Sequence, residues 1–203
     1  IDASQPDCGE AVHYWVKERG AVGIRLMELI KDSDIGWLDS RVGRDAWHAA
    51  AELNVPVCVH FFPWNRAVGL ARLQQILSEV PGLVVVVDHL SSIQSDAPGP
   101  DYGVDDLLSS IAQFENVVVK FTTIPLGRLD KAGIDARPLI ERVTRLFGAD
   151  RMMWGSDITQ SPGNYAYMAA LGQSSVGGLP TAQQEMILGG TAMRVYGGRW
   201  SRA

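Results

Sequence analysis

Short apolar runs alternate along this chain with amphipathic stretches of helical length. The clearest run, Leu83 to His89, is almost unbroken valine, which is typical of a strand buried on both faces of a parallel sheet. Similar runs predict strands at 22–26, 55–60, 117–122 and 152–157. The amphipathic stretches predict helices at 6–19, 40–53, 66–80, 104–114, 136–147 and 181–196. A strand and a helix therefore recur together, as in βαβ units of about 30 residues or more.

Repeated βα units with parallel, doubly covered strands leave two architectures, an open doubly wound sheet or a closed barrel. No GxGxxG motif follows the first predicted strand, so a dinucleotide-binding sheet has no support. A full (β/α)8 barrel takes about 250 residues. This chain has 203 and opens with Ile1 to Ser4, which we interpret as the end of a further strand. The sequence predicts an α/β fold: one TIM-type barrel domain over 1–203, from about the third strand to the eighth strand and a C-terminal helix, without the first two βα units.

Composition narrows the class of protein. Hydrophobic residues make up 46% of the chain and charged residues 20%, which suits one domain with a sizeable core. The net charge of −5 and the lack of a Lys/Arg cluster argue against nucleic-acid binding. The apolar runs are far shorter than the roughly 20 residues that a membrane span needs. Cys8 and Cys58 are too few for a disulfide framework and lack CxxC spacing, so a cytoplasmic location is expected.

Three predicted strands end in a residue type that binds metals: His60, His89 and Asp157. The carboxyl ends of barrel strands surround the active site, so equivalent positions in successive units would bring these residues to one rim. Imidazole and carboxylate groups suit zinc or manganese. Such a metal lowers the pKa of a bound water towards about 7, while an Asp or His takes the proton. His13 and His48 fall inside predicted helices, and we expect no chemical role for them.

Each of these residues also has a structural interpretation. A histidine that closes a strand is often only a hydrogen-bonded structural group. Asp157 follows Gly-Ser and could cap a following helix. Asp88 and His89 could form a buried pair in which the carboxylate only orients the ring. The recurrence of such residue types at equivalent points of successive units nevertheless favours a functional site.

An ordered set of motifs resembles the amidohydrolase-2 family of TIM-barrel hydrolases and decarboxylases. The motifs are VPVCVHFFPW at 55–64, VDHL at 87–90, NVVVK at 116–120, DRMMWGSD at 150–157 and ILGGTAMRVYG at 187–197. They extend over essentially the whole chain, and the ordered set is specific although each piece alone is weak. The family includes dicarboxylate and sugar lactonases and the aminocarboxymuconate semialdehyde decarboxylase.

The resemblance implies a role for each strand-end residue. His60 would be the metal ligand that ends the fifth barrel strand, and His89 would be the sixth-strand acid/base. Asp157 would be the eighth-strand aspartate that binds the metal or activates the water. The family's first-strand His-x-His is absent here, which leaves the metal site one or two ligands short, and Thr191 stands where the family has Asn.

Three further residues are candidates for substrate binding. Arg25 matches a fourth-strand position that in lactonase-like members helps to hold the substrate carboxylate, a task that suits a guanidinium fork. The alternative interpretation is that Arg25 only forms a structural ion pair at a strand end. Trp64 would wall the pocket and Lys120 would add a charge to it, with core packing and a structural ion pair as their respective alternatives.

The resemblance therefore implies a metal-dependent hydrolase, with zinc or manganese, that acts on a lactone or related bond of a carboxylated small molecule. A decarboxylase with the same ligands is the second expectation, and the loops expected at 91–102 and 122–131 would select between the two. A non-catalytic or inactive barrel fragment is the third, because a barrel without two strands exposes two sheet edges. A homo-oligomer is compatible with the sequence, which identifies no interface.

Overall fold

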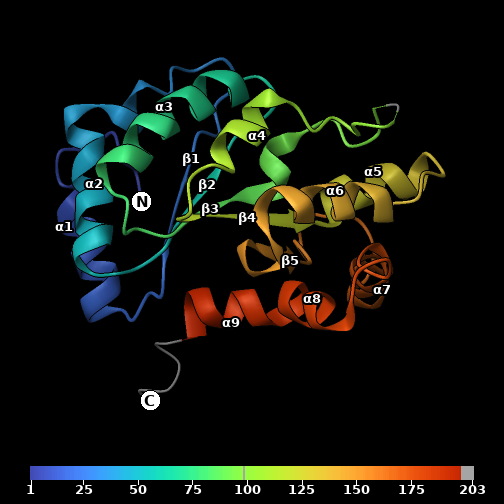
Figure 1. The fold of residues 1–203 in the computed structure, drawn as a ribbon. Coiled ribbons are helices and arrows are strands. Elements are labelled where there is room, and N and C mark those ends of the chain that lie inside the picture. Colours follow the sequence, from blue (N-terminus) through green and yellow to red (C-terminus); the bar gives the residue numbers. More distant parts are fainter. Residues whose placement is uncertain (98, 198–203) are drawn as a thin grey trace.

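A computed structural model describes residues 1–97 and 99–197 (Figure 1). Its core is one five-stranded sheet with the strands in sequence order. The strands are β1 (Ile24–Met27), β2 (Val57–His60), β3 (Val85–Val87), β4 (Val117–Thr122) and β5 (Met152–Gly155). Each strand pairs in parallel with the next, from Ile24 opposite Val57 to Thr122 opposite Gly155. This sequential parallel order confirms the predicted α/β barrel-type fold, and within the described residues the sheet stays open between β1 and β5.

Helices follow every strand. The elements before β3 are α1 (Cys8–His13), its π-helical continuation η1 (Tyr14–Glu18), η2 (Gly36–Asp39), α2 (Arg41–Glu52) and α3 (Arg66–Glu79). After β3 come η3 (Asp88–Ser92), α4 (Asp106–Ile111), α5 (Thr123–Lys131), α6 (Arg137–Phe147) and η4 (Ala149–Arg151). After β5 come α7 (Tyr165–Ser175), α8 (Thr181–Glu185), η5 (Met186–Gly190) and α9 (Thr191–Tyr196). The predicted end of the domain, at 203, lies outside the described residues.

Two helices were not predicted. The segment 122–131, expected to be a loop, contains α5, which begins where the Thr122 hydroxyl accepts a hydrogen bond from the Ile124 N–H. Pro125 is tolerated because it lies in the first turn, where its missing N–H has no helical partner. Helix α7 has no strong apolar stripe, because its alanine-rich sequence buries little more than Met168. The expected strand end at Ile1 is also wrong, since residues 1–7 form turns.

The sheet has two unlike faces because successive side chains of a strand point to opposite sides. Outward-facing valines of the strands pack under the surrounding helices in the main core. The inward-facing side chains form a small apolar layer of Cys58, Val86, Val118 and Met153. Helix α9 covers this layer with Tyr196 and neighbouring apolar side chains, on the side of the sheet opposite α3 and α4 (Figure 1). Arg25, His60, Lys120 and Thr122 also face inward, and these polar side chains contribute to the candidate site.

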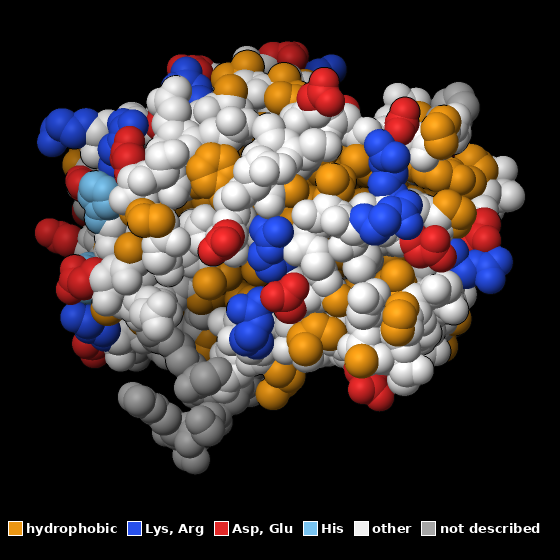
Figure 2. All heavy atoms as spheres, viewed as in Figure 1, with side chains coloured by type: hydrophobic (Ala, Val, Ile, Leu, Met, Phe, Trp, Pro, Cys, Tyr) orange, Lys and Arg blue, Asp and Glu red, His pale blue; other side chains and the backbone are white. Residues whose placement is uncertain are grey.

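The face of the molecule drawn in Figure 2 has a mixed surface. On the face in Figure 2, basic and acidic side chains are interspersed among hydrophobic ones, without a large patch of a single sign. In the described part of the chain, no helix combines the length and apolar character that a membrane span requires.

The packing of α2 yields a stability prediction. A Cβ atom added to Gly43 would lie 1.8 Å from the Trp37 carbonyl oxygen, whereas one added to Gly127 of α5 would meet no atom within 4 Å. We expect Gly43→Ala to lower the free energy of unfolding by about 2 kcal/mol, as overpacking does. Gly127→Ala should leave it unchanged or raise it by up to about 1 kcal/mol. Urea unfolding followed by circular dichroism measures both, and equal midpoints with equal m-values would contradict this packing.

Candidate active site at the carboxyl ends of the strands

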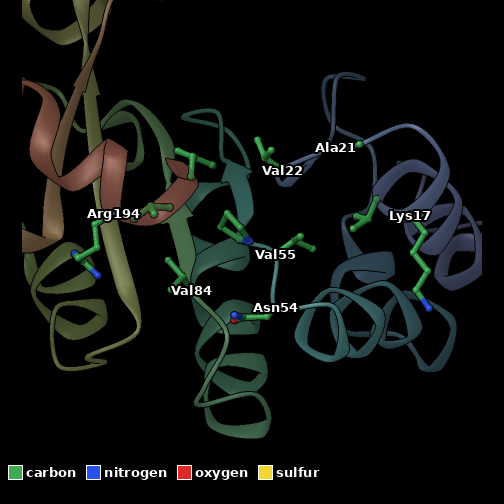
Figure 3. Close-up of a pocket in the computed structure, with 12 residues that line it drawn as sticks. Lys17, Ala21, Val22, Asn54, Val55, Val84 and Arg194 are labelled. Carbon is green, nitrogen blue, oxygen red and sulfur yellow. The ribbon is translucent and has the colours of Figure 1, made fainter. Parts of the chain in front are cut away.

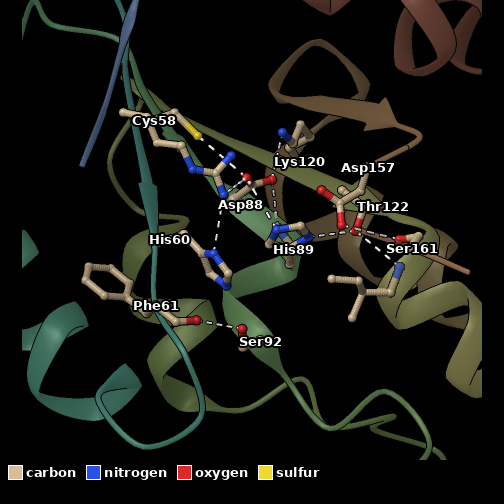
Figure 4. Close-up of polar contacts among 12 residues, drawn as sticks. Cys58, His60, Phe61, Asp88, His89, Ser92, Lys120, Thr122, Asp157 and Ser161 are labelled. Atoms are coloured by element: carbon tan, nitrogen blue, oxygen red, sulfur yellow. Dashed lines mark hydrogen bonds and ion pairs between the residues drawn. The ribbon is translucent and has the colours of Figure 1, made fainter. Parts of the chain in front are cut away.

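Asp88, which follows β3, is fully buried and connects four strands (Figure 4). Its Oδ2 lies 2.9 Å from Nη2 of Arg25 on β1, and its Oδ1 lies 2.8 Å from Nζ of Lys120 on β4. The backbone N–H of His89 donates to Oδ1 at 3.2 Å, and the thiol of Cys58 on β2 lies 3.8 Å from Oδ2. The Asp88 carboxylate is thus the shared hydrogen-bond and ion-pair acceptor for these neighbouring groups.

The charges around Asp88 keep it ionised. Burial alone would raise the pKa of Asp88, but the charges of Lys120, His89 and Arg25 and the Lys120 hydrogen bond outweigh burial and lower that pKa. Two cations share this one carboxylate, so one positive charge remains in excess. Arg25 is 40% exposed and Lys120 is 24% exposed, so both cations face the open end of the cluster as well as Asp88.

His60 ends β2 beside this cluster, and its Nδ1 lies 3.3 Å from Nη2 of Arg25. A guanidinium can only donate, so this nitrogen accepts and the proton of the neutral ring is assigned to Nε2. Burial, together with the charges of His89 and Arg25, lowers the pKa of His60 from 6.5 to about 4. At neutral pH, His60 therefore offers a hydrogen-bond donor at Nε2.

His89 lies against His60, with 4.5 Å between the ring centroids. Its Nδ1 is 2.7 Å from Oγ1 of Thr122, and its Nε2 is 3.5 Å from Oδ2 of Asp88. Because Nε2 faces the Asp88 carboxylate, we assign the ring proton to Nε2 and the Thr122 hydroxyl as the donor to Nδ1. Burial lowers the pKa of His89, although the charges of Asp88 and Asp157 act in the opposite direction. The ring is therefore held by β4 on one side and by Asp88 on the other.

The backbone that carries His89 has a left-handed conformation. The predicted strand to His89 ends earlier, at Val87, and residues 89–92 have φ values of 51°, 52°, 54° and 53°. None of these residues is glycine. A left-handed helical conformation costs roughly 1–2 kcal/mol for each such residue. The strand prediction failed here because nothing in the local sequence, such as Gly or Asn, indicates this turn.

Asp157 lies two residues beyond the end of β5, also with a positive φ of 53°. Its Oδ2 accepts a 3.3 Å hydrogen bond from the Ser161 hydroxyl, and its charge acts on His89. It does not cap the next helix, because Asn164 is the N-cap of α7. The carboxylate therefore lies at the same end of the sheet as the two histidines (Figure 4).

Trp64 lies at the outer end of a short aromatic stack. Its ring is parallel to that of Phe62 at 4.3 Å, and Phe62 is in turn 4.3 Å from the ring of His60. Trp64 is 41% exposed. The stack therefore extends from the surface to the imidazole of His60.

The residues present do not fit a resident divalent metal ion. Within residues 1–97 and 99–197, no group of three or more His, Cys, Asp or Glu side chains could hold one. His60 accepts from Arg25, both ring nitrogens of His89 have partners, and Asp88 already binds two cations. The sequence identified the ligand types and gave Arg25 and Lys120 as candidate substrate-binding residues, but it did not indicate that both would bind Asp88.

A cavity of about 850 Å³ lies at the other end of the sheet (Figure 3). Residues from η1, the amino ends of β1 and β2, and α9 line it, including Lys17, Val55 and Arg194. It contains none of the predicted site residues. We place the candidate site at the carboxyl ends because titratable groups with shifted pKa values converge there, which is typical of active sites.

Several members of this site were not predicted. The sequence predicted Asp88 only as a partner that orients His89, and it predicted no site role for Cys58, Thr122 or Ser161. A signal was present in the strands: Cys58 and His60, and likewise Lys120 and Thr122, are two residues apart and so face the same side. Their meeting around Asp88 depends on the register between strands, which the sequence alone does not give.

The buried charge predicts a large difference between two isosteric variants. Asp88→Asn leaves Arg25 and Lys120 without their anion, so the free energy of unfolding should fall by about 3 kcal/mol, as when one partner of a buried ion pair is removed. Asp157→Asn should change it by less than about 1 kcal/mol, because Asp157 forms no ion pair in the structure. Urea unfolding at pH 7 measures both values, and a small loss for Asp88→Asn would show that the ion cluster adds little.

A pH dependence follows from His60. Its pKa is lowered from 6.5 to about 4, so between these values the unfolded chain binds a proton that the folded chain does not. This contribution to stability is therefore complete above pH 6.5 and is lost as the pH falls towards 4. His60→Gln should flatten the decline in urea midpoint over this range, whereas His48→Gln, at an exposed position of α2, should not. Parallel declines in all three proteins would contradict the assignment to His60.

Comparisons with known proteins identify solved structures that have a similar fold. The chain is 20% identical to an amidohydrolase of Burkholderia multivorans, with a TM-score of 0.73, covering 97% of this chain and 71% of that one. A second crystal form of that protein contains zinc. The 2,6-dihydroxybenzoate decarboxylase of Rhizobium is 17% identical, with a TM-score of 0.69 and coverages of 97% and 69%. A candidate 2-pyrone-4,6-dicarboxylic acid hydrolase of Pseudomonas putida is 20% identical, with a TM-score of 0.68 and coverages of 93% and 67%.

Among curated protein sequences no match was found. At these identities the solved structures show the fold alone, and they include both hydrolases and decarboxylases. The family model described as Amidohydrolase matches residues 2–198, which is nearly the whole chain. The chain therefore belongs to the amidohydrolase family.

Proposed function

We propose that this site hydrolyses a lactone, or a related bond, in a small molecule that carries a carboxylate. The observation that supports this most directly is the excess positive charge of Arg25 and Lys120 over Asp88, next to two neutral histidines. Such a charge attracts an anion. The likeness to a candidate pyrone dicarboxylic acid hydrolase adds support for a substrate of this kind.

Substrate binding falls to the two cations. Arg25 uses one Nη group on Asp88, and its remaining N–H groups retain the fork geometry that suits a carboxylate. Lys120 uses Nζ on Asp88 and has further N–H groups to donate. A substrate carboxylate bound there would place the rest of the molecule against the aromatic stack of Phe62 and Trp64.

The hydrolytic step requires a base for water and a donor for the oxyanion. Asp157 is the proposed base: it takes a proton from water while the water oxygen bonds to the lactone carbonyl carbon. The Nε2–H of His60 stabilises the negative charge that develops on the carbonyl oxygen. The acyl C–O bond then breaks, and the leaving oxygen receives the proton from Asp157. His89 packs against the ring of His60, with 4.5 Å between the ring centroids, and so orients the Nε2–H of His60 for this step.

The test uses carboxylated lactones and their uncharged methyl esters, with ring opening followed by absorbance. Asp157→Asn should lower kcat about 1,000-fold, within the range for loss of a general base. Arg25→Lys keeps the charge beside Asp88 but loses the fork. It should therefore raise KM about tenfold for the carboxylated lactone and little for the ester.

The control is Arg72→Lys on α3, where the arginine pairs with Asp39 away from the site. Near-normal turnover in Asp157→Asn would reject Asp157 as the base. Release of carbon dioxide without ring opening would instead favour the decarboxylase expectation. No turnover of either kind by the unaltered protein would favour a non-catalytic role.

A further inference from the structure

The left-handed turn at residues 89–92 depends on contacts from outside itself. A backbone of this kind persists only when the surrounding structure over-determines it, and it is concentrated at functional sites. Here the turn follows Asp88 directly and carries His89 at its first position. Whatever holds the turn therefore also sets where the imidazole of His89 lies.

Two hydrogen bonds from neighbouring segments hold the turn. The Ser92 hydroxyl donates to the carbonyl oxygen of Phe61, just after β2, at 2.6 Å. Nε of Arg66, at the start of α3, donates to the carbonyl oxygen of Ser91, also at 2.6 Å. Leu90, which precedes these two serines in the turn, is fully buried. The Arg66 bond is the one with a charged donor, so it is the stronger type of the two.

Arg66 is itself fixed in place. Its Nη1 and Nη2 form a bidentate pair with Asp105 at 2.6 and 2.7 Å, and its side chain is only 11% exposed. Asp105 is in turn the N-cap of α4, where its Oδ1 accepts from the Leu108 N–H at 3.0 Å. All three nitrogens of the guanidinium therefore have partners, and the side chain joins the starts of α3 and α4 to the turn.

We propose that Arg66 is a positioning residue, which holds the left-handed turn through the Ser91 carbonyl and so places His89 for the proposed hydrolysis. The inference rests on that proposed function only for its catalytic consequence. Thr122 fixes the ring of His89 at Nδ1, and Arg66 fixes the backbone two residues further along the chain. Arg66 contacts neither His89 nor the cations of the site.

The experiment compares Arg66→Gln with Arg72→Gln, a substitution of the same kind on the same helix. Arg72 pairs with Asp39 through a 2.5 Å contact and has no bond to the turn. Hydrogen exchange of a peptide spanning residues 88–93 reports the turn. Long-range ¹H–¹⁵N spectra of the histidine rings report the environment of His89, with the exposed His48 as an internal reference.

In Arg66→Gln we expect exchange in the 88–93 peptide to accelerate about tenfold, as loss of a hydrogen bond from a charged donor implies. The ring signals of His89 should shift while those of His48 do not. Arg72→Gln should change neither. Where turnover is measured, Arg66→Gln should lower kcat and leave KM nearly unchanged, because Arg66 does not contact the substrate carboxylate site.

Two further variants test the same proposal if Arg66→Gln does not fold. Asp105→Asn removes the charge but keeps a good N-cap, so α4 should persist and the Ser91 bond should remain. Arg66→Lys keeps a cation for Asp105 but lacks the fork that reaches Ser91 at the same time. We therefore expect slow exchange at 88–93 in Asp105→Asn and fast exchange in Arg66→Lys.

Unchanged exchange and unchanged His89 signals in folded Arg66→Gln or Arg66→Lys would overturn the proposal. These measurements need no substrate. A protein that hydrolyses no lactone yet shows the expected changes would refute the proposed function and leave the role of Arg66 in placing His89 intact.

Discussion

The buried carboxylate of Asp88 is the constraint on which the rest of the site depends. A charge in the interior is stable only with partners, and Asp88 obtains them from β1 and β4 on either side of its own strand. Those two ion pairs hold the partly exposed side chains of Arg25 and Lys120 against the inner face of the sheet. The register of β1, β3 and β4 brings the three charged side chains together, and their ion pairs in turn stabilise that register.

This arrangement also fixes the character of the two histidines. Burial, assisted by the positive charges of Arg25 and Lys120, lowers the pKa of both His60 and His89, so both rings are neutral at pH 7. The site therefore presents neutral imidazole rings beside two cations that share only the Asp88 carboxylate. A polar cluster of this kind is suited to an anionic substrate, and it differs from the metal-centred arrangement that the residue types alone suggested.

The backbone around the site is strained in two places, at the turn after β3 and at Asp157 after β5. Both strained segments begin within two residues of a strand end, and both carry a titratable side chain. The apolar half of the inner face, covered by α9, and the main core beneath the outer helices supply the stability that this strain requires. The apolar half of the inner face therefore contributes to the stability of the fold, whereas the polar half forms the candidate site.

The sequence by itself determined the alternation of strands and helices, the parallel sheet, and the placement of His60, His89 and Asp157 at one end of it. These follow from local patterns of period 2 and 3.6 and from the rule that parallel strands share a carboxyl end. Helix α7 was missed because it buries too little for a stripe to show. Only the tertiary structure decided that Asp88 is the centre of the site, that Arg25 and Lys120 share it, and that His89 lies on a left-handed turn. Those features depend on strand register and on contacts between segments more than 20 residues apart, as with Arg66 and Ser91, and no local pattern encodes them.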